Sequence, residues 1–405
     1  MSTSPLSQFT LNNSLSNTSG DVLGHWSHTL ANGSETSLQI YDTVMRHTEA
    51  GVNVANNTFD ADFEHHLAAG SRHDIVWGLD YRFSSDVLTH AANSVLTATP
   101  SSRIDNLFAV FAQDEIRLQK ALFLTVGSKF EHNSYTGFEF EPSAQLVWTP
   151  SGRRSLWASA ARAIRQPDHI DLSVQFNEGV ISAPPFGSAL LKVLGNPRIQ
   201  AERLNDYEAG YREQFSPRLS LDVTAFFSFY KHLETDEPQS PFIDQSGASP
   251  FFVIPVMFQN LGSARTRGIE VFANVSVNKR WRVSPGFSMI NMTTSGDPGS
   301  RDATLGLAPG YMPKYQPQVR SLVNLRRDLE WDSSLKFVSR LTAPNVPGYV
   351  RLDSRLGWRI GESMEISVTG QNLATSRHIE FGDISNVFLT TEAARSIFGK
   401  VLWRF

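Results

Sequence analysis

The chain contains no cysteine among its 405 residues, which excludes disulfide bonds and thiolate metal sites. It also lacks a long apolar run. The longest, FFVIPVMF at residues 251–258, is interrupted by Pro255 and falls far short of the roughly 20 residues of a transmembrane helix. Basic residues are not in excess, since the net charge is −4, so we expect no nucleic acid among the partners.

The first stretch of the chain, MSTSPLSQFTLNNSLSNTSG, holds neither a basic segment nor an apolar core. A secretory signal peptide needs both. We therefore expect no signal peptide in the chain as written.

Apolar and polar residues alternate over long stretches, most clearly in YVRLDSRLGWRI at residues 349–360. One face of this stretch carries Val350, Leu352, Leu356, Trp358 and Ile360, and the other carries Arg351, Asp353, Arg355 and Arg359. Residues 122–131, 221–230 and 363–372 show the same period of two. This period indicates half-buried β-strands rather than helices.

The connections between these strands fall into two classes. Short ones lie at residues 32–34, 118–121, 150–153, 216–218, 278–280 and 360–362, and long ones at about 84–103, 166–202, 233–257, 295–314 and 374–391. Strands of roughly 10 to 14 residues also exceed the usual 5 to 6 of soluble sheets. Short turns at one end and long loops at the other are typical of an all-β, antiparallel transmembrane β-barrel. A soluble sandwich or propeller is disfavoured, because it seldom keeps a charged face on such long strands.

Charged residues on the polar faces of these strands are predicted to face the lumen of the barrel. They are Lys129, Glu131, Asp222, Arg351, Asp353, Arg355 and Arg359. A polar lumen would allow a hydrated solute to pass. A plainer interpretation is a ladder of charges that stabilises the wall.

Other polar motifs predict no catalytic or metal site. The DHID motif, residues 168–171, lies at the start of a long loop, where polar residues are ordinary. His65 and His66 are adjacent on a strand and therefore point to opposite faces. No spacing of Ser, Asp and His marks a triad, so we expect neither an enzyme nor a cofactor. The sequence does not identify the ligand-binding residues.

Several segments resemble TonB-dependent outer-membrane receptors. They are residues 108–167, 202–227 (ERLNDYEAGYREQFSPRLSLDVTAFF), 259–275 (QNLGSARTRGIEVFANV), 349–373 and the terminal GKVLWRF. The resemblance runs from about residue 20 to residue 405. It implies a barrel of about 22 strands filled by a plug domain. It also implies active uptake of a scarce ligand, a ferric siderophore, with the TonB complex as a partner of the intact receptor.

The strand count is about 17, starting at residues 21–31 on the long-loop side, whereas single-chain bacterial barrels have an even number. The resemblance therefore implies an irregular segment at residues 1–19 and a partial, incomplete barrel at residues 20–405, without the plug and the first five strands or so. The first and last strands would run in the same direction, so we expect an open, C-shaped wall or a strained closure. Two alternatives remain, a non-functional truncated fragment and a passive outer-membrane porin.

The chain ends on the strand SIFGKVLWRF, residues 396–405, in which Val401, Trp403 and Phe405 share an apolar face. The resemblance implies that these residues form the signal read by the outer-membrane assembly machinery. A plainer interpretation is that they only face outer-membrane lipid. Both interpretations place the protein in the outer membrane.

Overall fold

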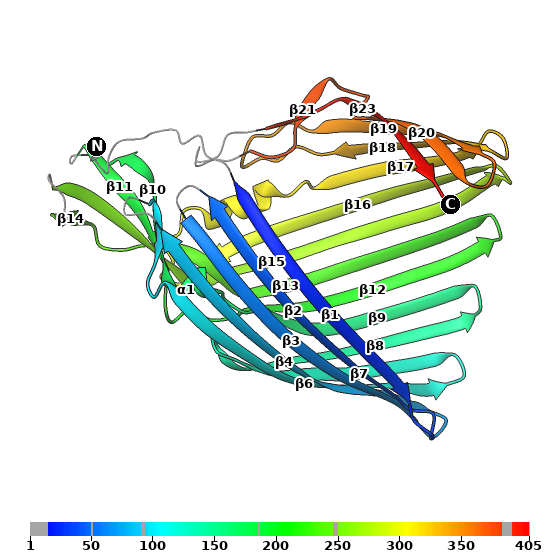
Figure 1. Cartoon of the computed structure of the whole chain (residues 1–405), viewed down its shortest axis with the longest axis horizontal. Helices are drawn as coiled ribbons and strands as arrows, with labels where there is room; N and C mark the ends of the chain where they lie inside the picture. The colour runs from blue at the N-terminus through cyan, green and yellow to red at the C-terminus, as the bar shows by residue number, and fades with distance from the viewer. Residues whose placement is uncertain are drawn as a thin grey trace.

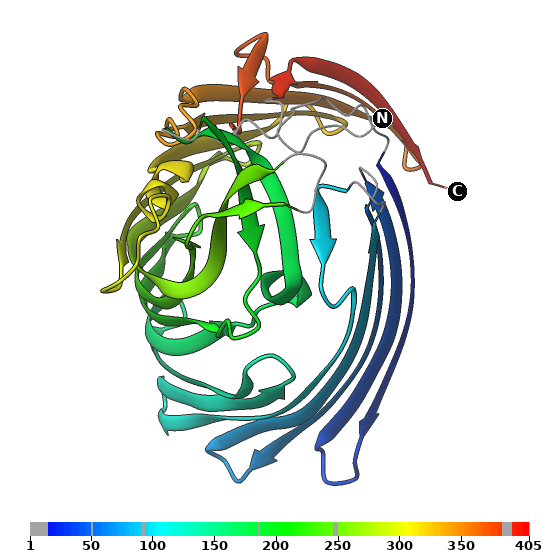
Figure 2. The ribbon, with the colours of Figure 1, turned by 90° about the vertical axis from the view of Figure 1, so that its left-hand side faces the viewer.

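The computed structural model describes residues 15–49, 52–90, 94–184, 187–245, 250–382 and 391–404. Within them the chain forms one long, curved wall of antiparallel strands, with additional short elements at one end (Figures 1 and 2). None of the helices in this part of the chain is long and apolar enough to cross a membrane.

The wall follows the sequence order, each strand pairing antiparallel with the next. Its strands are β1 (Ser16–Thr29), β2 (Glu35–Glu49), β3 (Val52–Ala69), β4 (His73–His90), β6 (Ser102–Gln119), β7 (Leu122–Asn133), β8 (Gly137–Ser151), β9 (Arg154–Arg165), β12 (Glu202–Ser216), β13 (Leu219–Pro238), β15 (Phe251–Asn278), β16 (Trp281–Gly296), β17 (Tyr315–Asn324), β18 (Leu329–Val338), β19 (Tyr349–Ile360), β20 (Met364–Gln371) and β23 (Ser396–Trp403). These 17 strands of the described residues confirm the number predicted from the sequence.

The predicted short turns are confirmed. β1 and β2 are joined at residues 30–34, β12 and β13 at 217–218, β15 and β16 at 279–280, and β19 and β20 at 361–363. Gly33 and Gly361 have φ values of +83° and +64° in the first and last of these turns, a conformation that glycine adopts without steric cost.

The opposite ends of the strands carry the remaining elements. They are β5 (Leu96–Ala98), α1 (His169–Ser173), β10 (Val174–Ser182), β11 (Ser188–Leu194), β14 (Phe242–Asp244), the 3₁₀ helix η1 (Leu305–Tyr311), β21 (Arg377–Ile379) and β22 (Glu392–Ala394). Two of the expected long loops are shorter than predicted, because β4 continues to His90 and β13 continues to Pro238. The ladder between β13 and β15 persists past register shifts between Lys231 and Thr235.

The wall is one layer thick where a sandwich would have two. Phe130, Phe227 and Val368 remain 54%, 37% and 54% exposed. A second sheet packed on this face would bury them. The sandwich alternative is therefore wrong, and the apolar face is free to meet lipid.

The wall is open between its first and last strands. Among the described residues, β1 pairs only with β2 and β23 pairs only with β20. Both strands run toward the short-turn side, and all 14 residues of β1 are exposed. The expected open wall is confirmed. β1 begins at Ser16, so the irregular segment expected at residues 1–19 was too long, and residues 1–14 lie outside the described part of the chain.

Candidate functional site: the polar face of the wall

The two faces of the wall are chemically distinct. Residues that lie opposite each other in neighbouring strands share a face, and Arg355 of β19 lies opposite Asp332 of β18 and Thr369 of β20. We call the face that carries Arg355 the polar face and the other the apolar face.

The exposure of the side chains differs between the two faces. Arg355 is 28% exposed, whereas its neighbour Leu356 is 47% exposed on the apolar face. Val350 and Trp358 are likewise exposed there, and Leu352 is half-buried.

All seven charged residues predicted from the sequence lie on the polar face, and every one forms an ion pair. Arg355 is at the centre of the largest group. Its Nη1 lies 3.4 Å from Asp332 Oδ2 and 3.8 Å from Glu330 Oε2, and its Nη2 bonds to Glu365. Arg359 bonds to Glu330 in turn. The group thus links β18, β19 and β20 through alternating charges.

Arg351 and Asp353 form a second group nearer the long-loop side. Arg351 Nε donates to both carboxylate oxygens of Asp353, at 3.1 and 3.0 Å. Asp353 Oδ1 also accepts from the backbone N–H of Asn372 at 2.9 Å. Asp353 therefore holds the end of β20 against β19.

The remaining predicted residues lie further around the wall. Lys129 Nζ is 2.7 Å from Glu131 Oε2, and Glu131 also accepts from Asn133 Nδ2 at 3.0 Å. Asp222 accepts from Arg212 Nε at 2.6 Å. The partners Asp332, Glu365 and Arg212 were not predicted, because their proximity depends on a strand register that period-two alternation does not reveal.

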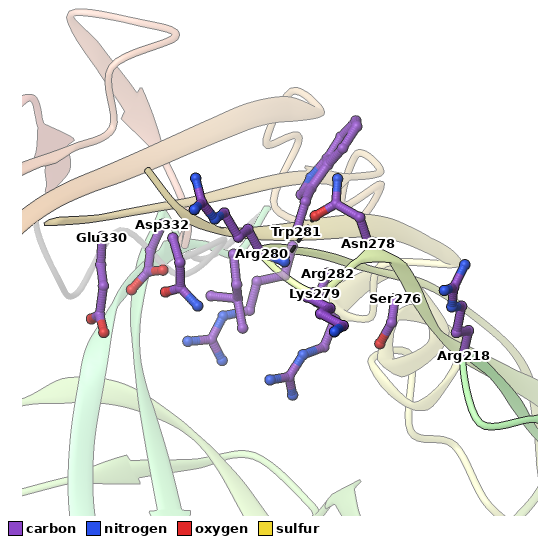
Figure 3. Close-up of a pocket in the computed structure, with 12 residues that line it drawn as sticks. Arg218, Ser276, Asn278, Lys279, Arg280, Trp281, Arg282, Glu330 and Asp332 are labelled. Atoms are coloured by element: carbon purple, nitrogen blue, oxygen red, sulfur yellow. Dashed lines mark hydrogen bonds between the residues drawn. The ribbon is translucent and has the colours of Figure 1, made fainter. Parts of the chain in front are cut away.

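A pocket of about 500 Å³ opens on the polar face at the short-turn end (Figure 3). It is bordered by Arg218 from the turn between β12 and β13, by the turn between β15 and β16, and by β17 and β18. Figure 3 shows Glu330 and Asp332 reaching toward the pocket, whereas Trp281 points away from them. This pocket could not be predicted from the sequence, because its residues come from separate hairpins.

A second, acidic pocket of about 340 Å³ lies at the long-loop end. Its walls include Glu234, Asp236 and Asp302. Glu234 and Asp236 lie beyond the stretch of β13 needed to cross a bilayer, which is about 9–11 residues, and Asp302 lies in the connection that follows β16. Burial, with a contribution from Asp171, raises the pKa of Glu234 to about 7. Burial and the charge of Asp302 raise the pKa of Asp236 to about 6.

The DHID motif forms the N-terminus of α1. Asp168 Oδ1 accepts from the backbone N–H groups of Ile170 and Asp171, at 2.7 and 3.0 Å, and the Asp171 side chain accepts from the Asp168 N–H at 3.0 Å. This reciprocal capping explains the spacing of the two aspartates. His169 is buried and contacts the Pro100 carbonyl oxygen at 2.9 Å. Its ring is therefore used in packing the loop.

Tryptophans form a band near the short-turn edge of the apolar face. They are Trp26, Trp148, Trp281, Trp331, Trp358 and Trp403, each at least 41% exposed. Trp331 Nε1 donates to Ser354 Oγ at 2.9 Å and Trp358 Nε1 donates to Asp328 Oδ2 at 3.0 Å. Such bands mark the membrane–water interface of outer-membrane barrels.

The C-terminal strand contributes to the same face. Val401 and Trp403 are 66% and 70% exposed and lie opposite Ile366 and Met364 of β20. Phe405, the third residue of the predicted assembly signal, lies outside the described residues.

The fold and its two faces define the wall of an outer-membrane β-barrel. The sequence model described as "TonB dependent receptor-like, beta-barrel" matches residues 4–373. The chain belongs to the TonB-dependent receptor family.

Known proteins similar to the chain include a ferric enterobactin receptor of Pseudomonas aeruginosa, which is 27% identical over 173 residues, or 42% of this chain and 23% of the receptor. An iron-regulated outer membrane virulence protein of Vibrio cholerae is 21% identical over 63% of this chain and 37% of its own length. The first of these relatives is named as a receptor and the second as an outer membrane protein.

Solved structures share the fold. The siderophore receptor PirA of Acinetobacter baumannii superposes with a TM-score of 0.70 at 14% identity, over 96% of this chain and 63% of that one. The outer membrane transporter YddB of Escherichia coli gives 0.71 at 11% identity, with the same coverage. The chain thus spans less than two thirds of the length of these two proteins.

Proposed function

We propose that the chain is the C-terminal barrel portion of a TonB-dependent outer-membrane receptor that imports a ferric siderophore by active transport. The continuous polar face on a wall whose other face is apolar is the observation that carries the proposal. Relatives named for ferric enterobactin and for siderophores support an iron chelate as the ligand.

In this proposal, Lys129, Glu131, Asp222, Arg351, Asp353, Arg355 and Arg359 line the lumen, and their ion pairs also stabilise the wall. A hydrated, charged chelate would pass along this face without meeting lipid. Val401, Trp403 and Phe405 act in recognition by the assembly machinery, and the Trp band anchors the wall in outer-membrane lipid. The TonB complex is a partner of the intact receptor.

Uptake of ⁵⁵Fe-labelled siderophores tests this function. The genomic reading frame that encodes the chain is expressed in a receptor-deficient Gram-negative strain, with and without an uncoupler of the proton-motive force. The expected result is accumulation of at least one ferric chelate, which the uncoupler abolishes. Uptake that survives the uncoupler would support the porin alternative and contradict the proposal.

The 405 residues alone provide the second arm of the test. With an added signal peptide, they are expected to give no uptake, because the outer edges of β1 and β23 have no partner strand among the described residues. An open strand edge in hydrocarbon costs several kcal/mol per unsatisfied group. Robust energy-dependent uptake from these residues alone would contradict the open wall.

A further inference from the structure

The pocket at the short-turn end of the polar face is strongly basic. Five of its residues are cationic: Arg218, Lys279, Arg280, Arg282 and Arg320. Only two carboxylates, Glu330 and Asp332, border the same space. The pocket therefore carries an excess of positive charge within about 500 Å³, a volume in the range of small-molecule sites.

The two carboxylates are already engaged elsewhere. Glu330 bonds to Arg359, and both Glu330 and Asp332 lie within 4 Å of Arg355. None of the five basic side chains of the pocket forms an ion pair with any described residue, although Arg355 alone has three acidic partners. The arginines around Arg355 on β19 are thus compensated by carboxylates, whereas Arg282 of β16 and Arg320 of β17 have no ion-pair partner among the described residues.

Arg282 and Arg320 form the centre of this arrangement. Arg282 lies opposite Leu322, and Arg320 lies opposite Ser284. The two arginines are therefore diagonal neighbours on the polar face of β16 and β17. Diagonal neighbours in a sheet are within reach of each other when their side chains are long. An anion bound between the two arginines would therefore be attracted by both and would offset their mutual repulsion.

We propose that this pocket binds a compact multivalent oxyanion, with phosphoryl groups as the class that it fits. Arginine presents a planar fork of N–H donors that matches phosphate oxygens in pairs. Four of the five cations are arginines, and they come from two turns and two strands that border the same pocket. The phosphoryl group comes either from a soluble solute that reaches the polar face or from the headgroup of an anionic lipid at the short-turn edge of the wall.

Calorimetric titration of the full chain, folded in zwitterionic detergent, with pyrophosphate tests the site directly. The pocket variant is R282Q/R320Q. Its matched control is R326Q/R327Q, which removes the same charge from two exposed arginines in the adjacent turn between β17 and β18, outside the pocket. We expect saturable binding that weakens at least about tenfold in the pocket variant, or about 1.4 kcal/mol, and stays within about twofold in the control.

A third variant, R282K/R320K, keeps the charge but removes the two forks. We expect it to bind pyrophosphate several-fold more weakly than the original chain. If far-UV circular dichroism shows that R282Q/R320Q does not fold, R282K/R320K replaces it in the comparison with the control. Equal weakening in the pocket and control variants would overturn the proposal, because it would show attraction to surface charge alone.

The lipid arm repeats the comparison in nanodiscs that contain an anionic phospholipid. Retention of that lipid by the original chain, lost in R282Q/R320Q and kept in R326Q/R327Q, identifies the headgroup as the source of the phosphoryl group. If neither pyrophosphate nor the anionic lipid distinguishes the pocket variant from the control, the proposal is wrong.

Discussion

Arg355 of β19 and Glu365 of β20 form an ion pair across adjacent strands on the polar face. The same guanidinium also lies 3.4 Å from Asp332 of β18. One cation therefore compensates carboxylates on both neighbouring strands. Both carboxylates contact the same guanidinium, so removing it leaves two half-buried like charges without the cation that compensates them.

We expect R355Q to lower the free energy of unfolding by about 1–2 kcal/mol, less than for a fully buried pair because these groups are partly exposed. Urea unfolding in lipid vesicles measures the change. The double variant R355Q/E365Q should recover part of the loss, because it removes one of the repelling charges. A loss in the double variant that equals the sum of the two single losses would show that the pair is not coupled.

The stability of the chain in a bilayer should depend strongly on whether a new charge is placed on the apolar face or on the polar face. Val110 of β6 is 44% exposed on the apolar face, opposite Leu79 and Phe130. V110R should cost about 2–4 kcal/mol in a bilayer. Q113R, on the polar face of the same strand, should change stability by less than about 0.5 kcal/mol. A tolerated V110R would show that this face does not contact lipid.

The acidic pocket predicts a pH dependence of stability. Because the pKa of Glu234 is raised from 4.5 to about 7 in the folded chain, the folded state binds more protons than the unfolded state between these values. Stability should therefore fall as the pH rises from about 4.5 to about 7.

E234Q should remove most of this fall and stabilise the chain by about 1–2 kcal/mol at pH 8. The measurement is the urea midpoint as a function of pH. The control E362Q replaces an exposed glutamate in the turn between β19 and β20 and should leave the profile unchanged. A profile for E234Q that still falls like the original would exclude Glu234 as the cause.

Local alternation was sufficient to predict the faces of the strands but not their lengths. Residues 16–19 are polar and show no alternation, yet they extend β1 by pairing with residues 45–48 of β2. Pro238 and Pro255 interrupt the pattern around 233–257, but β13 and β15 continue as a paired ladder there. These residues belong to strands because they pair with a neighbouring strand, and local alternation in a single sequence does not show which strands pair.

In the candidate site, too, local alternation predicts the face of a residue, but the pairing of strands decides which residues lie together. Arg351, Asp353, Arg355 and Arg359 could be assigned to one face because they alternate within one strand. The basic pocket could not be predicted, since Arg218, Arg282 and Arg320 are brought together by the register and curvature of β13–β17.

The proposed function requires that water reaches the polar face while lipid covers the apolar face. Because the chain has no cysteine, single-cysteine variants can test it without background. Thr224 and Ala225 are consecutive residues of β13 on the polar and apolar face, respectively. The measurement is the rate of labelling of T224C and A225C by a membrane-impermeant maleimide in lipid vesicles, with labelling in denaturant as the reference. We expect rapid labelling of T224C and protection of A225C. Rapid labelling of A225C with protection of T224C would show that the two faces are assigned the wrong way round.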